Sequence, residues 1–152
     1  MSIELMEILT FLWLLVAFFT WLATHIKTKK DTKITNTVNL INNLSTVEHL
    51  LNADLEVRRA IKNNHEFDYD KIDEKLEKQL TVLLDYYEFL AELYDRDVID
   101  NDSVEHLRGG LMLEAFEKSK SYIEHLRRKL NRNDLYKKYE VLSTKIASNK
   151  RS

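Results

Sequence analysis

The sequence contains no cysteine and no proline, and it has only two glycines. Without cysteine, the chain cannot form disulfides, use a thiol nucleophile or hold zinc through thiolates. The scarcity of proline and glycine removes the residues that usually mark the turns of β-rich folds. We therefore expect an all-α protein in which long helices are joined by short polar connections.

An excess of charge of one sign is also absent. The chain carries 23 basic and 25 acidic residues among 152, which gives a formal net charge of −2. Proteins that bind nucleic acid generally show a basic patch or a high net positive charge. We therefore expect no nucleic-acid partner. The length leaves room for one domain and a short additional segment.

One long uncharged stretch is present near the start of the chain, at Ile8–Thr24. Together with its apolar neighbours it reaches the roughly 20 residues that a transmembrane helix needs. A cleaved signal peptide would have a basic start and a small-residue cleavage site, and neither is found here. The stretch therefore predicts a retained N-terminal transmembrane helix, and the residues expected to mark it are Ile8, Leu12, Trp13, Ala17, Trp21 and Thr24.

Basic residues follow the uncharged stretch, and none precedes it. Because basic flanks stay in the cytoplasm, we expect a single-pass protein of the inner membrane with its N-terminus outside. This divides the chain into an anchor at 1–30, a cytoplasmic helical domain at 31–148 and a disordered tail at 149–152. The residues expected to set the topology and to meet lipid headgroups are Lys27, Lys29, Lys30 and Lys33.

Small and hydroxyl-bearing residues gather on one face of the same stretch. At 100° per residue, Thr10, Ala17, Thr20 and Thr24 share that face, and such residues allow helices to approach closely. The stretch could therefore serve as a tether alone, or it could also assemble the protein through helix–helix contact.

The remainder of the chain has the apolar periodicity of amphipathic helices. The strongest pattern runs to about Asp95, and we expect Leu83, Tyr87 and Leu90 to pack in its core. A later helix is expected to start at Asp102 and to contain Gly109 and Gly110. Each glycine costs about 1 kcal/mol against alanine inside a helix. This cost favours close packing of a neighbouring helix at the pair, or a kink there.

Two segments of the helical domain carry a family likeness. The runs LLDYYEFLAELYDRDVID and SYIEHLRRKLNRNDLYKKYEVL resemble a bacterial family called domain of unknown function 4760. The resemblance implies a single N-terminal span, a small cytoplasmic helical domain and no established activity. It also implies a role in phage exclusion, because such genes look frequent in prophage-like contexts. The residues that match the family pattern are Tyr87-Glu88-Phe89, Val98-Ile99-Asp100, Ile123, Leu126-Arg127, Tyr139-Glu140 and Leu142.

Residues with catalytic chemistry do not form a recognisable constellation. The five histidines lack metal-ligand spacing, and no serine lies in a nucleophile motif. The acidic junction from Asp95 to Asp102 lacks the glycine and distal glutamate of a calcium-binding loop. Basic residues concentrate between Arg127 and Lys138, which suggests a surface that faces lipid or a partner. We therefore expect no enzyme, no metal, no cofactor and no small-molecule substrate.

These observations lead to one functional hypothesis and one alternative. The chain is predicted to be a membrane-anchored, non-enzymatic interaction or regulatory protein that binds membrane lipids and either a protein partner or itself. The alternative is an oligomeric pore or membrane-perturbing effector built from the N-terminal helix.

Overall fold

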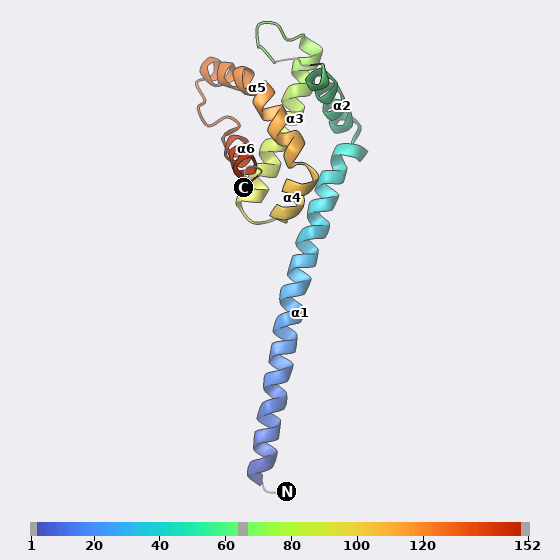
Figure 1. Cartoon of the computed structure of the whole chain (residues 1–152), viewed down its shortest axis with the longest axis vertical. Coiled ribbons are helices and arrows are strands. Elements are labelled where there is room, and N and C mark those ends of the chain that lie inside the picture. The colour runs from blue at the N-terminus through green and yellow to red at the C-terminus, as the bar shows by residue number, and fades with distance from the viewer. Residues whose placement is uncertain (1–2, 64–66, 150–152) are drawn as a thin grey trace.

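Helices make up the protein, as the composition predicts. The computed structural model describes residues 3–63 and 67–149, and it describes side chains from residue 12 onward within those ranges. Figure 1 shows a long helix whose C-terminal part joins a compact group of shorter helices, while its N-terminal part projects away. The six helices are α1 (Ile3–Thr46), α2 (Glu48–Lys62), α3 (Glu74–Asp95), α4 (Asn101–Leu107), α5 (Gly109–Leu130) and α6 (Lys137–Asn149).

The long helix α1 extends for 44 residues, which corresponds to a length of about 66 Å. No proline or glycine interrupts it, and its threonines stay compatible with the helix. Thr20, Thr24, Thr28 and Thr32 each donate a hydroxyl hydrogen bond to the carbonyl four residues earlier. The domain boundary predicted at residue 30 therefore falls within one continuous helix. The tail predicted from residue 149 lies almost entirely outside the described residues.

The predicted transmembrane helix is not found. Within the described part of the chain, no helix is long and apolar enough to cross a membrane. The same finding overturns three expectations: a single-pass membrane protein, an inner-membrane location and an N-out orientation. The all-α part of the fold prediction agrees with the structure.

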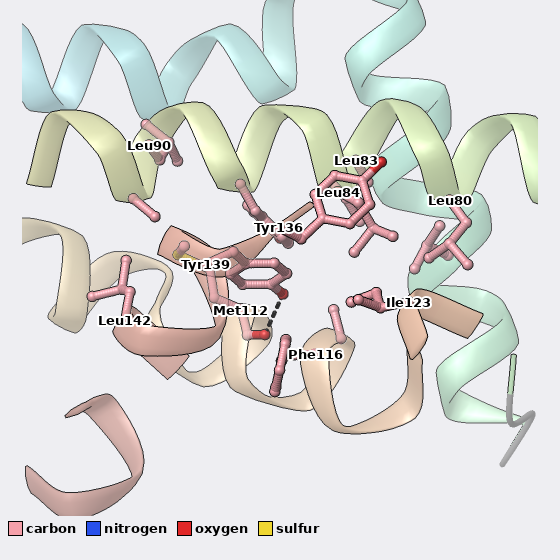
Figure 2. Packing of buried hydrophobic residues seen from close by; sticks show 14 of the residues in the cluster. Leu80, Leu83, Leu84, Leu90, Met112, Phe116, Ile123, Tyr136, Tyr139 and Leu142 are labelled. Atoms are coloured by element: carbon pink, nitrogen blue, oxygen red, sulfur yellow. Dashed lines mark hydrogen bonds between the residues drawn. The ribbon is translucent and has the colours of Figure 1, made fainter. Parts of the chain in front are cut away.

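The core is built around a buried tyrosine on α6. Tyr139 lies between the rings of Tyr87 and Phe116, each with its centroid 5.3 Å away. Its hydroxyl donates a hydrogen bond to the backbone carbonyl of Met112, as Figure 2 shows. Leucines from α3 surround this contact, so that α3, α5 and α6 share one apolar interior. The fully buried leucines of α3 are Leu80, Leu83, Leu84 and Leu90.

Two helices end with non-glycine residues in the left-handed conformation. Asn131 follows α5 with φ of 50°, and Asp97 follows α3 with φ of 55°. In the first case the N–H of Arg132 reaches the carbonyl of Arg127 at 3.0 Å, which is the long hydrogen bond of a Schellman motif. Neither position carries glycine, which adopts the left-handed conformation more easily than asparagine or aspartate does.

A first prediction concerns the end of α5. Asn131→Ala should lower the free energy of unfolding by about 1 kcal/mol, because the short polar side chain of asparagine supports the left-handed conformation through local hydrogen bonding and alanine has no such group. Asn131→Gly should leave stability unchanged or raise it, since glycine adopts this conformation without strain. Chemical denaturation of both variants measures the difference. Equal stability of the two variants would contradict the assigned conformation.

A second prediction concerns the start of α4. The carboxylate of Asp100 accepts hydrogen bonds from the Ser103 hydroxyl at 2.6 Å and from the Ser103 N–H at 2.9 Å. These bonds lower the pKa of Asp100 below its ordinary value of 3.8. A lowered pKa in the folded state means that the carboxylate stabilises the fold above the ordinary value and that this stability is lost as pH falls through the lowered one.

Asp100→Asn keeps an acceptor oxygen but removes this titration. The variant should therefore lose less stability than the original chain when pH falls from about 5 to about 3. Asp102→Asn, which changes an exposed carboxylate two positions later, is the matched control and should keep the original pH dependence. Denaturation curves at several pH values test this, and identical slopes for all three proteins would refute it.

Candidate interaction surface

The C-terminal part of α1 is fixed to the other helices by polar contacts as well as by packing. Thr37 is fully buried, and its hydroxyl accepts a hydrogen bond from the N–H of Asp100 at 2.7 Å. The same hydroxyl donates to the carbonyl of Lys33 at 2.7 Å. The ammonium of Lys33 pairs with the carboxylate of Asp97 at 2.6 Å. Together with the buried Ile41 and Leu44, these contacts hold α1 in one direction relative to α4.

The N-terminal part of α1 carries an exposed apolar surface, which we call the α1 arm and define as Leu12–Ile26. It projects beyond the other helices (Figure 1). Trp13 is 73% exposed and Phe19 is 61% exposed, although both are large apolar side chains. Monomeric proteins seldom expose contiguous apolar patches above a few hundred Å². The exposed large apolar residues of the arm are Leu12, Trp13, Leu14, Leu15, Val16, Phe18, Phe19, Trp21 and Ile26.

Polar groups within the arm add little to its hydrogen-bonding capacity. The hydroxyls of Thr20 and Thr24 donate to the carbonyls of Val16 and Thr20 at 2.8 Å. This local bonding satisfies the hydroxyl hydrogens and leaves the methyl groups to contribute to the surface. The ring of His25 stacks on Trp21 with centroids 5.4 Å apart. The arm is therefore apolar around its whole circumference.

The structure places most of the predicted membrane residues on this arm. Leu12, Trp13, Ala17, Trp21 and Thr24 are all exposed there. The side chain of Ile8 lies outside the described residues, as does that of Thr10.

The predicted headgroup lysines divide into two groups. Lys27, Lys29 and Lys30 are exposed just after the arm, whereas Lys33 is half-buried and paired with Asp97. Lys33 therefore ties α1 to the loop before α4.

The residues expected to pack between helices are found at three kinds of position. Leu83, Tyr87 and Leu90 are buried in the core. Gly109 begins α5, and a Cβ added there would lie 3.4 Å from a methyl carbon of Ile146 on α6. Gly110 is exposed. The glycine pair therefore lies at the break between α4 and α5, next to a closely packed helix.

The two charged clusters seen in the sequence are engaged in contacts within the chain. Asp95 pairs with Lys138 of α6, and Asp97 pairs with Lys33 of α1. These two carboxylates of the acidic junction are therefore bound by lysines from different helices. Over the described residues, no group of three or more acidic or histidine side chains could hold a metal ion. The basic segment is likewise partnered through Arg127–Glu140, Lys137–Glu140, Arg132–Asp134 and Lys138–Asp95.

A second feature, absent from the sequence-based expectations, is a cleft between α2, α3 and α5. It encloses about 240 Å³. At its edge, Asp54 is buried and accepts two bonds from the guanidinium of Arg58, one from Nε at 2.9 Å and one from Nη2. The guanidinium of Arg108 lies 3.5 Å from the same carboxylate. The spacing of Asp54 and Arg58, four residues apart within an apolar pattern, is the sequence signal that could have indicated this pair.

No curated protein and no solved structure matches the chain at a significant level. A family model described as Domain of unknown function (DUF4760) matches residues 7–146, which covers α1 from within its first turns through almost all of α6. The expected family likeness is confirmed, and the chain belongs to the family known as domain of unknown function 4760.

Proposed function

We propose that this protein is a non-enzymatic interaction protein that assembles with copies of itself through the α1 arm. The observation that carries the proposal is the row of large apolar side chains exposed from Leu12 to Ile26. Burying a single side chain of this size contributes about 1.5–3 kcal/mol. Several such side chains on each arm supply enough driving force to offset the entropy lost on association.

A second copy of the arm suits this surface because the surface is apolar on every side. A helix of this type is normally buried among other elements on all its faces. A single groove on an unrelated partner would cover one face and leave the others in water. Arms from several copies cover one another, and each one supplies the same apolar surface to its neighbours.

The charges beside the arm favour antiparallel pairing. The sequence has two glutamates before the apolar stretch and Lys27, Lys29 and Lys30 after it. In an antiparallel pair the acidic end of one helix lies beside the basic end of the other, whereas a parallel pair brings like charges together. Complementary charges at helix ends set partner orientation in helical assemblies.

The centre of the arm also fits this arrangement. Ala17 has a small side chain, and Trp13 and Trp21 lie four residues before and after it. All three share one helical face at 100° per residue. With the two-fold axis at Ala17, the helices approach closely at the alanines and each Trp13 meets the partner copy of Trp21. This contact is isologous, as in most homodimers.

The alternative of an oligomeric pore or membrane-perturbing effector and the expected lipid partner stay predictions that no contact in the molecule addresses. A role in phage exclusion stays a prediction that no contact in the molecule addresses. The proposal therefore concerns self-association only, in even-numbered assemblies built from antiparallel pairs of arms.

A third prediction follows from the alanine at the proposed axis. Ala17→Glu should raise the dissociation constant of the assembly by about 100-fold, because two carboxylates would be buried beside each other. Val141→Glu changes an exposed apolar residue on α6 and serves as the matched control, which should leave the assembly intact. Light scattering coupled to size-exclusion chromatography measures the mass. A full-length chain that is monomeric at high concentration would overturn the proposal.

A fourth prediction tests the direction of pairing, and it uses the absence of native cysteine. In an antiparallel pair centred on residue 17, an Ala17→Cys chain should form an intermolecular disulfide under oxidising conditions. A Thr24→Cys chain should not, because the two cysteines would be about 21 Å apart along the axis. Non-reducing electrophoresis distinguishes the two. Efficient cross-linking of both chains would indicate parallel arms and would leave self-association itself intact.

A further inference from the structure

The cleft between α2, α3 and α5 has the construction of a small binding site. Its volume of about 240 Å³ exceeds the roughly 150 Å³ that suffices to hold a benzene molecule in an apolar cavity. The walls are aliphatic, and one side is lined by charged side chains. The aliphatic wall residues are Val57, Ile61, Leu83, Leu111 and Ala115.

Tyr87 lines the cleft, and its hydroxyl has no hydrogen-bond partner among the described residues. The residue is 1% exposed. Its hydroxyl is not among the fully buried polar atoms that lack a partner in the described chain, which are Asn101 Oδ1 and Ser143 Oγ, so it keeps access to the cleft. The other core tyrosines are partnered: Tyr139 bonds to Met112, Tyr136 to Asp85 and Tyr122 to Glu77. Buried hydroxyls are nearly always hydrogen-bonded, so an unpartnered one beside a cavity indicates a place for a ligand or water.

The surroundings keep the Tyr87 hydroxyl protonated. Burial raises its pKa well above the ordinary value, and the nearby Asp54 carboxylate raises it further, although Arg108 and Arg58 act in the opposite direction. The group is therefore a neutral O–H that can donate to a bound acceptor.

The hydrogen-bonding capacity left over in the cleft consists mainly of donors. The Asp54 carboxylate is already occupied by Arg58 and Arg108. Arg58 uses Nε and Nη2 on Asp54 and leaves Nη1 available, and its side chain is 38% exposed. Among the described residues, neither Lys62 nor Glu114 forms an ion pair. The cleft therefore has three free donor groups, on Tyr87, Arg58 and Lys62, and one free acceptor group, on Glu114.

We propose that this cleft binds a small carboxylate with an apolar body, with the carboxylate near Arg58, Lys62 and the Tyr87 hydroxyl and the apolar body between α2, α3 and α5. The cavity volume limits the ligand to about six to ten heavy atoms. A carboxylate fits because it accepts several hydrogen bonds at once and can take two from an arginine edge. The site is separate from the α1 arm and does not depend on self-association.

The test uses three probes with the same number of carbon atoms, six: hexanoate, hexanol and hexylammonium. Titration of the isotope-labelled full-length chain is followed by NMR, with the amide signals of Leu83, Tyr87 and Ala115 as reporters. Hexanoate should bind with a dissociation constant on the order of 1 mM and at least about tenfold more tightly than the other two. Binding of the alkyl chain to the α1 arm is common to the three probes and shifts other signals.

Two variants assign the donors. Tyr87→Phe removes only the hydroxyl and should weaken hexanoate binding by about three- to tenfold. Lys62→Met removes an exposed charge and should weaken it by about threefold. Lys75→Met, which changes an exposed lysine beside a different cleft, is the control and should have no effect. Equal affinity for the three probes, tighter binding of hexylammonium, or no shift at the cleft signals would each overturn the proposal.

Discussion

The hydroxyl of Thr37 connects the long helix to the rest of the molecule, and the direction of α1 depends on it. It lies in a fully buried position, where it donates to the carbonyl of Lys33 and accepts from the N–H of Asp100. The side chain of Asp100 in turn caps α4 through Ser103. One hydroxyl therefore links α1 to the first turn of α4. Replacing it with an apolar group would leave the partly buried N–H of Asp100 without this partner, which costs on the order of 1 kcal/mol.

Rigid attachment of α1 matters because the exposed apolar surface lies beyond the attachment point. The helix has no proline or glycine, so a hinge between its two parts has no local cause. The salt bridge from Lys33 to Asp97 and the hydrogen bond from the Tyr86 hydroxyl to the carbonyl of Leu40 hold two further points of α1. The direction of the α1 arm is thus set by the packing of α3 and α4, and any assembly through the arm would orient the remaining helices in a defined way.

The sequence was sufficient to predict the helical class and much of the core, because both depend on local periodicity. Leu83, Tyr87 and Leu90 recur at three- and four-residue spacing and are buried. Helix starts were harder to predict, because several polar residues lie near each one. Asp100 caps α4 where Asp102 was expected, and Asp73, one of several aspartates nearby, caps α3. The choice among neighbouring aspartates depends on where each helix packs, which local pattern does not contain.

Long-range contacts partner residues of both charged segments. The basic segment near the C-terminus suggested a surface for lipid or a partner, yet Lys138 pairs with Asp95, 43 residues earlier in the chain. The acidic junction that contains Asp95 is partnered as well, because Asp97 pairs with Lys33 of α1. The packing of α6 against α3 and of α1 beside α4 brings these residues together, which the local sequence pattern does not contain.

The cleft differs from those clusters because it combines a local ion pair with residues from other helices. Asp54 and Arg58 are four residues apart on α2, so their pairing is local and could be read from the sequence. What makes the site unusual is the addition of Arg108 from the α4–α5 junction and Tyr87 from α3. Arg108 adds a second guanidinium beside the Asp54 carboxylate, while Tyr87 adds a buried donor. A structural ion pair alone would not require an aliphatic cavity beside it, and the presence of both is what favours a ligand over a purely structural role.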